Sequence, residues 1–410
     1  MELEEAVKLF ADKVKHTNQI EETGLVECHG RILAEDIKAP FNVPHFPKSA
    51  MDGYAVRSED ISSASEDEPV RLAVIGKILA GCDMIPYEDS GMMTGKSGTC
   101  VRIMTGADIP EGYDTIVKQE DTDYGEKSVA VKCALPPYMN YCRIGEDISE
   151  GDTVIKAGIR IGRVHVGILA SLGISSVRVL KPLRVSVIST GSELCDPTVS
   201  GSIPTKGKIY NSIAYMLSAS VESVGFEAKT FMCPDEPDII TDAINKAASS
   251  SDIIITTGGV SVGERDLMPD IMESIGAQRV FYKVNIQPGT PTLGSVYKGI
   301  PVLSLSGNPY AALVNFDWYF WNLAASMTGC SELLPRVENV ISRSEYRKKN
   351  HMRRFLRAWT ENGTVSIPVK SHASSVLSSI TKCNCYIDLP AQTEFGEGDT
   401  VKVIRMPDVM

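Results

Sequence analysis

The sequence predicts an elongated, multi-subdomain chain of the α/β plus β class, with a central doubly wound, mostly parallel sheet. Strand and helix patterns alternate from residue 182 to residue 329, which is the order that builds a parallel sheet with helices on both faces. Short strands separated by Gly, Pro and Asp fill residues 47–136, and an all-β pattern follows residue 330. We therefore expect an α/β domain with an inserted β-rich subdomain and a small C-terminal β-barrel.

These patterns divide the chain into four regions. The expected regions are 1–46 together with 137–181 (helical and extended), 47–136 (inserted and β-rich), 182–329 (α/β) and 330–410 (β-barrel). In the N-terminal region, Leu3, Val7, Phe10 and Val14 share one face of a helix, and a second helix is expected over Arg163–Leu172. The inserted region holds four predicted strands, with the sequences VRLAVIG, TCVRIM, DTIVKQE and KSVAVKCAL.

The α/β and C-terminal regions carry clear start and stop signals. Asn211 or Ser212 can cap a helix that Gly225 ends. The apolar face of that helix is formed by Ile213, Met216, Leu217, Val221 and Val224. A second helix, with Ile240, Ala243, Ile244 and Ala247, precedes a strand at Asp252–Thr256. In the C-terminal region, the Asn362-Gly363 dipeptide predicts a hairpin turn between FLRAWT and VSIPVK, and DTVKVIRM predicts a late strand.

Three strands of the α/β region lead into turns rich in Gly and hydroxyl residues. They are RVSVIST before GSEL (184–194), SDIIITT before GGVSVGERD (251–266) and the strand in IPVLSLSGNPYAALVNF (300–316). A strand that ends in such a turn and opens a helix directs unpaired N–H groups at anions. Ligands of open parallel sheets lie beyond the carboxyl ends of the strands, so the three turns predict a shared oxyanion site. In the third turn, Pro309 suits a first helical position, and a structural role explains much of the motif.

Composition excludes several classes of function. Acidic residues outnumber basic ones by 52 to 41, and the net charge of −11 disfavours a general binder of nucleic acid or anionic membranes. The ten cysteines form no CxxC pair, which predicts reduced thiols and no zinc site. Without an apolar signal region or a long apolar run, we expect a cytoplasmic protein that is neither exported nor inserted into a membrane.

Two acidic residues stand in the Gly-rich turns. Glu193 follows Thr-Gly-Ser, and Asp266 closes the second turn, so both could stand near a bound phosphate. Like charges there require a bridging cation, and Mg²⁺ is commonly held by one or two carboxylates together with phosphates and waters. In the alternative, Glu193 is a first-turn helix acid and Asp266 a helix N-cap. Spacing alone leaves both interpretations open.

Seven ordered motifs connect the chain to a known family. They are FPKSAMDGYAV (46–56), RIMTGADIPEGYDTIVKQE (102–120), RIGEDISEGD (143–152), STGSEL (189–194), GKIYNS (207–212), TTGGVSVGERD (256–266), and PGTP followed by SGNP. With these motifs, the chain resembles the molybdopterin molybdenumtransferases, the family that includes the C-terminal domain of gephyrin, over essentially its whole length.

The resemblance implies an activity and an assembly. Members insert molybdate into adenylylated molybdopterin, and AMP is released in a magnesium-dependent step. The implied assembly is a homodimer, with each cleft formed by the α/β domain of one subunit and the β subdomain of the other. The implied partners are the molybdopterin adenylyltransferase and recipient molybdoenzymes.

The resemblance also implies site residues. Asp52, Glu193 and Asp266 are the implied catalytic residues, and Glu193 and Asp266 are the implied magnesium ligands. The implied cofactor-binding residues are Thr105, Asp147, Thr190, Gly191, Ser192, Asp235, Thr257, Gly258, Gly259, Ser261, Gly263, Pro288, Gly289, Ser306, Gly307, Asn308 and Pro309.

Structural alternatives accompany several of these residues. Asp52 can serve a tight Asp-Gly turn through backbone hydrogen bonds, and Asp147 can cap a turn. Asp235, in a Pro-bounded loop, can cap the next helix.

The chain departs from the family's pattern at two cations. Relatives carry lysines around the Pro-Gly pair where this chain has Gln287 and Thr290, and neither side chain attracts an oxyanion by its charge. Ser306 also replaces a proline, which is a milder change. Lys283 or Arg265 could compensate. The departures raise a second hypothesis, a non-catalytic scaffold paralogue that binds the pterin nucleotide without turnover.

One basic cluster, Arg343–Trp359, lies near the start of the C-terminal region. It can be a docking face for an acidic partner or for the pterin phosphate, or a solvated hairpin with alternate residues exposed. The following segment around Ser371, His372, Ser374 and Ser375 resembles a serine-containing segment near the family's cleft, and no catalytic role is assigned to it.

Overall fold

The computed structural model describes residues 1–87, 94–199, 203–260, 267–368 and 372–406. The chain forms two compact units. The larger unit contains Met1–Glu35, Ala157–Val166 and Ser176–Met410, and the smaller unit contains Asp36–Lys156 and Gly167–Ser175. The finer division into four regions, expected from the sequence, stays a prediction.

The larger unit is built on a six-stranded sheet. Its strands, in spatial order, are β16 (Glu227–Cys233), β13 (Arg184–Thr190), β17 (Ile253–Thr257), β21 (Ile300–Leu305), β20 (Leu293–Tyr297) and β18 (Gln278–Tyr282). The first four are parallel, β20 runs in the opposite direction, and β18, which pairs antiparallel with β20, runs in the direction of the first four. The predicted mostly parallel sheet is therefore confirmed.

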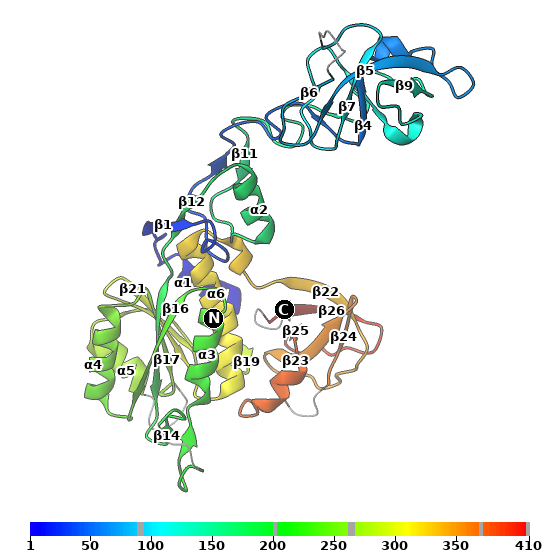
Figure 1. The fold of residues 1–410 in the computed structure, drawn as a ribbon. Coiled ribbons are helices and arrows are strands. Elements are labelled where there is room, and N and C mark those ends of the chain that lie inside the picture. Colours follow the sequence, from blue (N-terminus) through cyan, green and yellow to red (C-terminus); the bar gives the residue numbers. More distant parts are fainter. Residues whose placement is uncertain (88–93, 200–202, 261–266, 369–371, 407–410) are drawn as a thin grey trace. The chain divides into compact units, whose positions relative to one another are not determined.

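Helices cover both faces of this sheet because alternate strand residues point to opposite sides. Val185 and Val187 pack in the core that includes α3 (Ser212–Glu222), α6 (Pro309–Thr328) and α1 (Leu3–Ala11). Ile188 packs in a second core with α4 (Pro237–Ala248) and α5 (Leu267–Ser274). Figure 1 shows α4 and α5 on one side of the sheet and α3 and α6 on the other.

Several predicted elements are confirmed, with small shifts of their ends. The side chain of Asn211 caps α3 by accepting from the backbone N–H of Ala214 at 3.2 Å, so Asn211 and not Ser212 is the cap. Helix α1 ends before Val14, which packs against the core from beyond the helix. The structure also confirms α2 (Arg163–Ser171) and α4 at their predicted places.

The first Gly-rich turn does not open a helix. β13 leads through Gly191 into β14 (Leu194–Cys195), which pairs in parallel with β15 (Ile209–Tyr210), and α3 begins only after β15. The expectation of a strand, turn and helix was therefore wrong here, because the paired strands β14 and β15 come between this turn and α3. The other two strands keep the expected order, because among the described residues α5 is the next element after β17 and α6 is the next element after β21.

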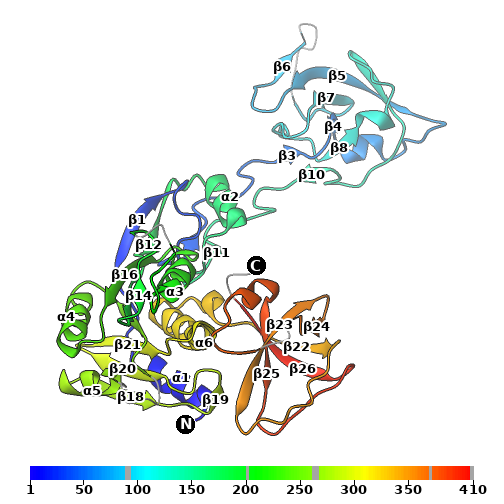
Figure 2. The ribbon, with the colours of Figure 1, turned by 90° about the horizontal axis from the view of Figure 1, so that it is seen from below.

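The C-terminal region of the larger unit is a closed barrel, as predicted. Its five strands, in order around the barrel, are β23 (Arg353–Glu361), β24 (Thr364–Ser366), β22 (Val337–Ser342), β26 (Thr400–Arg405) and β25 (Cys385–Leu389), which pairs with β23 again. Asn362 and Gly363 have φ of 48° and 73°, which are the values of the predicted hairpin turn. Figure 2 shows this barrel in orange and red.

Short elements complete the larger unit. β19 (Ile286–Gln287) pairs in parallel with the start of β23 and so joins the barrel to the α/β sheet. The others are β1 (Ile20–Gly24), which pairs with β12 (Ser176–Leu180), and the 3₁₀ turns η3 (Ser331–Leu333) and η4 (Ser378–Lys382).

The smaller unit is β-rich, as expected for the insertion. Its main sheet contains β6 (Ile85–Pro86), β5 (Val70–Ile78), β7 (Thr99–Ile103), β4 (Gly53–Val56), β8 (Thr115–Lys118) and β9 (Ser128–Val131). The two-stranded pairs are β2 (Ile37–Lys38) with β11 (Thr153–Ile155) and β3 (Lys48–Ser49) with β10 (Tyr141–Cys142), and the 3₁₀ turns are η1 (Ser58–Ile61) and η2 (Gln119–Asp121). Among the described residues of the whole chain, no helix has the length and apolarity that a membrane span requires.

Candidate functional site

The Gly-rich turns meet at the carboxyl edge of the parallel sheet. β13, β17 and β21 are adjacent and parallel, so the residues that follow them emerge side by side. A Cβ built on Gly307 would lie 3.7 Å from the Cα of Gly258, and one on Gly258 would lie 2.3 Å from the carbonyl oxygen of Thr190. The structure therefore places Thr190, Gly258 and Gly307, from three turns, side by side.

The second turn requires glycine. Gly258 and Gly259 have φ of 95° and 66°, a left-handed region that residues with a Cβ rarely adopt. The N–H of Gly258 donates to the carbonyl oxygen of Leu305 at 3.0 Å, which ties this turn to the end of β21. The predicted residues Ser261, Gly263 and Asp266 of the same motif lie outside the described residues.

The hydroxyl groups at the strand ends hold the turns together. Thr190 and Thr257 are buried. The Oγ of Ser189 lies 2.9 Å from the Oγ1 of Thr257 and 3.3 Å from the Oδ1 of Asn211. The Oγ1 of Thr190 donates to the carbonyl oxygen of Thr257 at 3.4 Å. These hydroxyls thus connect the ends of β13 and β17 and fix the spacing of the two turns that follow them.

Two carboxylates are anchored on the first turn. Glu193 is exposed, and its carboxylate folds back over Gly191, where an added Cβ would lie 2.8 Å from the Oε2 of Glu193. Asp235 accepts from the backbone N–H of Ser192 at 3.1 Å, and its own N–H donates to the Oγ of Ser192 at 3.3 Å. Neither carboxylate belongs to a helix end. The alternatives of a first-turn acid for Glu193 and an N-cap for Asp235 were therefore wrong, since β14 follows Glu193 and Glu236 occupies the N-cap position of α4.

The third turn exposes the start of the longest helix in the described chain. Pro309 is the first residue of α6, as predicted, and Asn308 occupies the N-cap position without a side-chain capping bond. The Oγ of Ser306 accepts from the N–H of Asn308 at 3.3 Å, so serine holds this turn in place of the family's proline. The N–H of Tyr310 donates to the carbonyl oxygen of Ser374 at 3.0 Å. The serine-containing segment therefore lies against this turn.

The Pro288-Gly289 pair packs on the same helix. Gly289 has φ of 99°, and a Cβ there would lie 2.0 Å from the Nδ2 of Asn315. That Nδ2 donates to the carbonyl oxygens of Gly289 at 2.9 Å and of Ala311 at 3.2 Å. The buried amide of Asn315 thus fixes the loop, a contact that no sequence motif indicated.

Gln287 and Thr290, which stand where relatives carry lysine, make different contacts. The Oγ1 of Thr290 donates to the carbonyl oxygen of Ile286 at 2.6 Å, which is a local backbone contact. The Oε1 of Gln287 accepts from the Nη1 of Arg354 at 3.1 Å, because β19 and β23 pair with Gln287 opposite Arg354. A cation therefore does stand beside Gln287. Sequence reasoning missed it because the pairing joins residues 67 positions apart.

The strand portion of the basic cluster is not solvated. Arg357 is fully buried, and its guanidinium lies 4.1 Å from the ring centroid of Tyr310 and donates to the carbonyl oxygen of Ala373 at 2.9 Å. Arg353 is held by Asp388 at 2.6 and 2.7 Å and by Glu4 at 2.7 and 2.8 Å. The solvated-hairpin interpretation was therefore wrong for the strand portion, where Arg353 and Arg357 are held by neighbouring segments, and the docking face stays a prediction.

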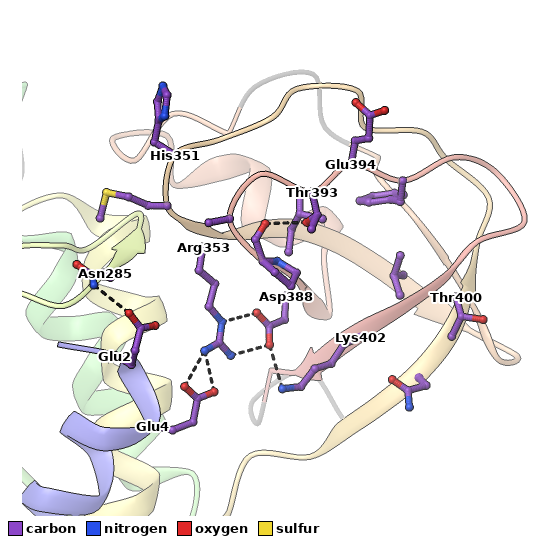
Figure 3. A pocket seen from close by; sticks show the side chains of 17 residues that line it. Glu2, Glu4, Asn285, His351, Arg353, Asp388, Thr393, Glu394, Thr400 and Lys402 are labelled. Atoms are coloured by element: carbon purple, nitrogen blue, oxygen red, sulfur yellow. Dashed lines mark hydrogen bonds and ion pairs between the residues drawn. The ribbon is translucent and has the colours of Figure 1, made fainter.

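A separate concavity of about 900 Å³ lies between the start of α1 and the barrel (Figure 3). Arg353, Asp388, Glu4 and Lys402 form an ion-pair network on its floor, with Lys402 lying 3.1 Å from Asp388. None of the predicted site residues that the structure describes lines this concavity. The predicted site and the concavity are thus different surfaces of the larger unit.

The remaining predicted residues lie in the smaller unit. The Oδ1 of Asp52 accepts from the backbone N–H of Thr105 at 2.7 Å and from its hydroxyl at 2.8 Å. These two bonds hold the pKa of the exposed Asp52 carboxyl below its usual range. Asp147 is exposed, and its N–H donates to the carbonyl oxygen of Val43. The structure brings Asp52 and Thr105 together across 53 positions, so these contacts are not those of a local Asp-Gly turn.

Within the described residues of the chain, no three His, Cys, Asp or Glu side chains gather closely enough to hold a metal ion by themselves. A cation at the carboxyl edge of the sheet would therefore need ligands from a bound substrate or water.

The chain matches three family descriptions along its length. They are "MoeA N-terminal region (domain I and II)" over residues 1–173, "Probable molybdopterin binding domain" over residues 186–325 and "MoeA C-terminal region (domain IV)" over residues 339–406. The second description covers all three Gly-rich turns.

Individual proteins agree with these descriptions. The chain is 35% identical to the molybdopterin molybdenumtransferase of Staphylococcus epidermidis over 385 residues, which cover 93% of this chain and 90% of that protein. It is 35% identical to the Staphylococcus aureus protein of the same name, over 91% and 88% of the two chains. The crystal structure of a molybdopterin biosynthesis MoeA protein from Pyrococcus horikoshii OT3 superimposes with a TM-score of 0.84 at 28% identity, over 99% of this chain and 100% of that one. With this agreement in sequence and fold, the chain belongs to the MoeA family of molybdopterin molybdenumtransferases.

Proposed function

We propose that this protein inserts molybdate into adenylylated molybdopterin and releases AMP in molybdenum cofactor biosynthesis. The observation that carries the proposal is the meeting of three Gly-rich turns at one edge of the parallel sheet, with Gly258 in contact range of both Thr190 and Gly307. Relatives named molybdopterin molybdenumtransferase support the same reaction. Molybdate and the pterin nucleotide are then the substrates.

The turns offer what phosphates require. The dipole of α6 places partial positive charge at its start, and Gly258 and Gly307 have no side chain to keep a ligand away from the backbone. Since the whole chain has a net charge of −11, attraction for an anion has to come from such local donors. The phosphate groups of the nucleotide would bind at this edge.

Mg²⁺ fits this edge. Glu193 is an exposed carboxylate held over Gly191, and carboxylates combine with phosphates and waters to hold this ion. Glu193, together with Asp266 from outside the described residues, would hold it. When bound, Mg²⁺ would neutralise charge on the phosphates. Asp235 keeps the N–H of Ser192 oriented and so positions the turn that carries Glu193.

The rest of the proposal concerns the smaller unit and the assembly. Asp52, Thr105 and Asp147 would contact substrate from the smaller unit, with an Asp52 carboxylate whose pKa the bonds from Thr105 lower. We propose a cytoplasmic homodimer that completes each site. It would receive its substrate from the molybdopterin adenylyltransferase and deliver the cofactor to recipient molybdoenzymes.

A second candidate, a scaffold that binds the pterin nucleotide without turnover, is favoured by Gln287 and Thr290. The hydroxyl of Thr290 is turned onto the Ile286 carbonyl oxygen and offers no charge. Arg354 opposes this candidate, because its guanidinium lies 3.1 Å from Gln287 and supplies a cation beside the missing lysine. We therefore favour the enzyme.

The deciding experiment measures AMP release from adenylylated molybdopterin by the purified protein with Mg²⁺, titrated with molybdate and separately with tungstate. Oxyanion-dependent release supports the enzyme and identifies the metal that it uses. Tight binding of the nucleotide without release supports the scaffold.

Two sets of variants refine this result. Glu193→Gln and Asp266→Asn should each lower AMP release by on the order of 100-fold while leaving the fold intact, whereas Glu361→Gln, at an exposed strand end in the barrel, should have no effect. On the scaffold hypothesis, Gln287→Lys with Thr290→Lys should raise activity from near zero. On the enzyme hypothesis, the same double change should leave turnover nearly unchanged.

A further inference from the structure

An exposed aromatic and apolar surface lies beside Asp52 and Thr105 in the smaller unit. β3 pairs with β10, with Ser49 opposite Tyr141, and the N–H of Ala50 donates to the carbonyl oxygen of Asn140 at 3.0 Å. The N–H of Gly106 donates to the carbonyl oxygen of Ser49 at 2.8 Å. Three segments, 48–52, 104–107 and 138–143, therefore converge. Their exposed apolar side chains are Met51, Tyr138 and Met139.

Tyr138 is held in an unfavourable backbone conformation with its ring half exposed. Its φ is 66°, which is uncommon for a bulky side chain, and 50% of the residue is accessible to solvent. The surroundings impose this conformation, because the N–H of Tyr138 donates to the Asp114 carbonyl oxygen at 2.6 Å and the Nδ2 of Asn140 donates to the Ile116 carbonyl oxygen at 3.0 Å. The backbone contacts therefore hold the ring of Tyr138 partly in solvent beside Asp52 and Thr105, where a ligand can reach it.

Neighbouring side chains fix the orientation of the ring. The guanidinium of Arg143 lies over Tyr138, 4.3 Å from the ring centroid, and the ring of Tyr141 meets it edge-on at 5.4 Å and 86°. Within the residues that the structure describes, the guanidinium of Arg143 makes no hydrogen bond and no ion pair. Arg143 is exposed, so its N–H donors and the guanidinium face turned away from Tyr138 remain open to a ligand.

From this arrangement we infer that Tyr138 and Arg143 form a stacking platform for a planar nitrogen heterocycle that carries a phosphate. The ring would stack on the Tyr138–Arg143 pair, and the free N–H groups of Arg143 would meet the phosphate. This inference rests on the proposed function, whose substrate contains two such rings, a pterin and an adenine. Tyr138 is then a substrate-positioning residue beside Asp52.

The test measures equilibrium binding of two probes, AMP and pterin-6-carboxylate, to the full-length protein by calorimetry. Tyr138→Leu should raise the Kd of at least one probe on the order of tenfold, since loss of one aromatic stack has that size, and Tyr138→Phe should stay within about twofold of the parent. A change for AMP alone assigns the platform to adenine, and a change for the pterin alone assigns it to the pterin.

Tyr124→Leu is the matched control, because Tyr124 has φ of 60° and is also 50% exposed, so the replacement carries the same backbone cost. It should bind both probes like the parent. Parent-like binding of both probes by Tyr138→Leu, or no binding of either probe by the parent, would overturn the inference. If the parent releases AMP with molybdate and Tyr138→Leu has the same KM as the parent, the platform is wrong and the proposed function stands. Absence of release by the parent is evidence against the proposed function itself.

Discussion

Replacing Gly258 with alanine is the sharpest test of the contact between the turns. The added methyl group would lie 2.3 Å from the carbonyl oxygen of Thr190 and 2.8 Å from its Oγ1, while Gly258 has φ of 95°. Because ordinary Cβ contacts begin near 3.4 Å, the first two turns would have to separate by about 1 Å. The change therefore probes both the backbone conformation and the close approach.

The expected loss of stability follows from three contributions. A side chain in the left-handed region costs about 1–2 kcal/mol. Overpacking adds about 1–3 kcal/mol, and weakening the bond from Gly258 N–H to the Leu305 carbonyl oxygen adds about 1 kcal/mol. We expect Gly258→Ala to lower the free energy of unfolding by about 3–6 kcal/mol. A 1 Å displacement at the site should also lower kcat/KM for AMP release on the order of 100-fold.

The control is Gly299→Ala, in the turn between β20 and β21 of the same sheet. Gly299 has φ of 81°, and nothing lies within 4 Å of its added Cβ. Urea unfolding should show a loss of only about 1–2 kcal/mol for this variant, with unchanged AMP release. Equal losses of stability for both variants, or full activity of Gly258→Ala, would refute the argument that the turns must touch.

Three further predictions concern the larger unit. Asp388→Asn should lower the free energy of unfolding in urea by about 3 kcal/mol, because the largely buried Arg353 loses the carboxylate that it is paired with. Adding Arg353→Met should recover most of that loss. If the two changes were simply additive, the coupling of the pair would be contradicted. Burial, together with Arg357 and Arg354, lowers the pKa of His372 to about 4. The unfolded chain binds that proton near pH 6.5, so stability should fall by about 1–3 kcal/mol as the pH drops from 6.5 to 4, and His372→Gln should remove this dependence in unfolding curves recorded across that range. Asn211→Ala should cost about 1 kcal/mol by thermal unfolding, whereas Asn308→Ala, at an N-cap position without a capping bond, should cost only a few tenths.

Local pattern predicted most elements of the fold. Alternation in β13 separates Val187 from Ile188 onto two cores, and the Asn211 cap and the Asn362-Gly363 hairpin follow from short-range chemistry. The Gly-rich turns are recognisable for the same reason, since a glycine at positive φ has a local signature. The amino-acid sequence by itself thus determined the elements, the family and the edge of the sheet that carries the candidate site.

Only the tertiary structure decided which distant residues meet there. Asp235 reaches Ser192 across 43 positions, Arg354 reaches Gln287 across 67, and Arg353 reaches Glu4 across 349. Sequence patterns placed Asp235 at a helix end and the arginines on a solvated hairpin, because propensity describes a residue's own element and not its neighbours in space. These contacts depend on strand register and barrel closure, where a shift of one residue turns each side chain to the opposite face.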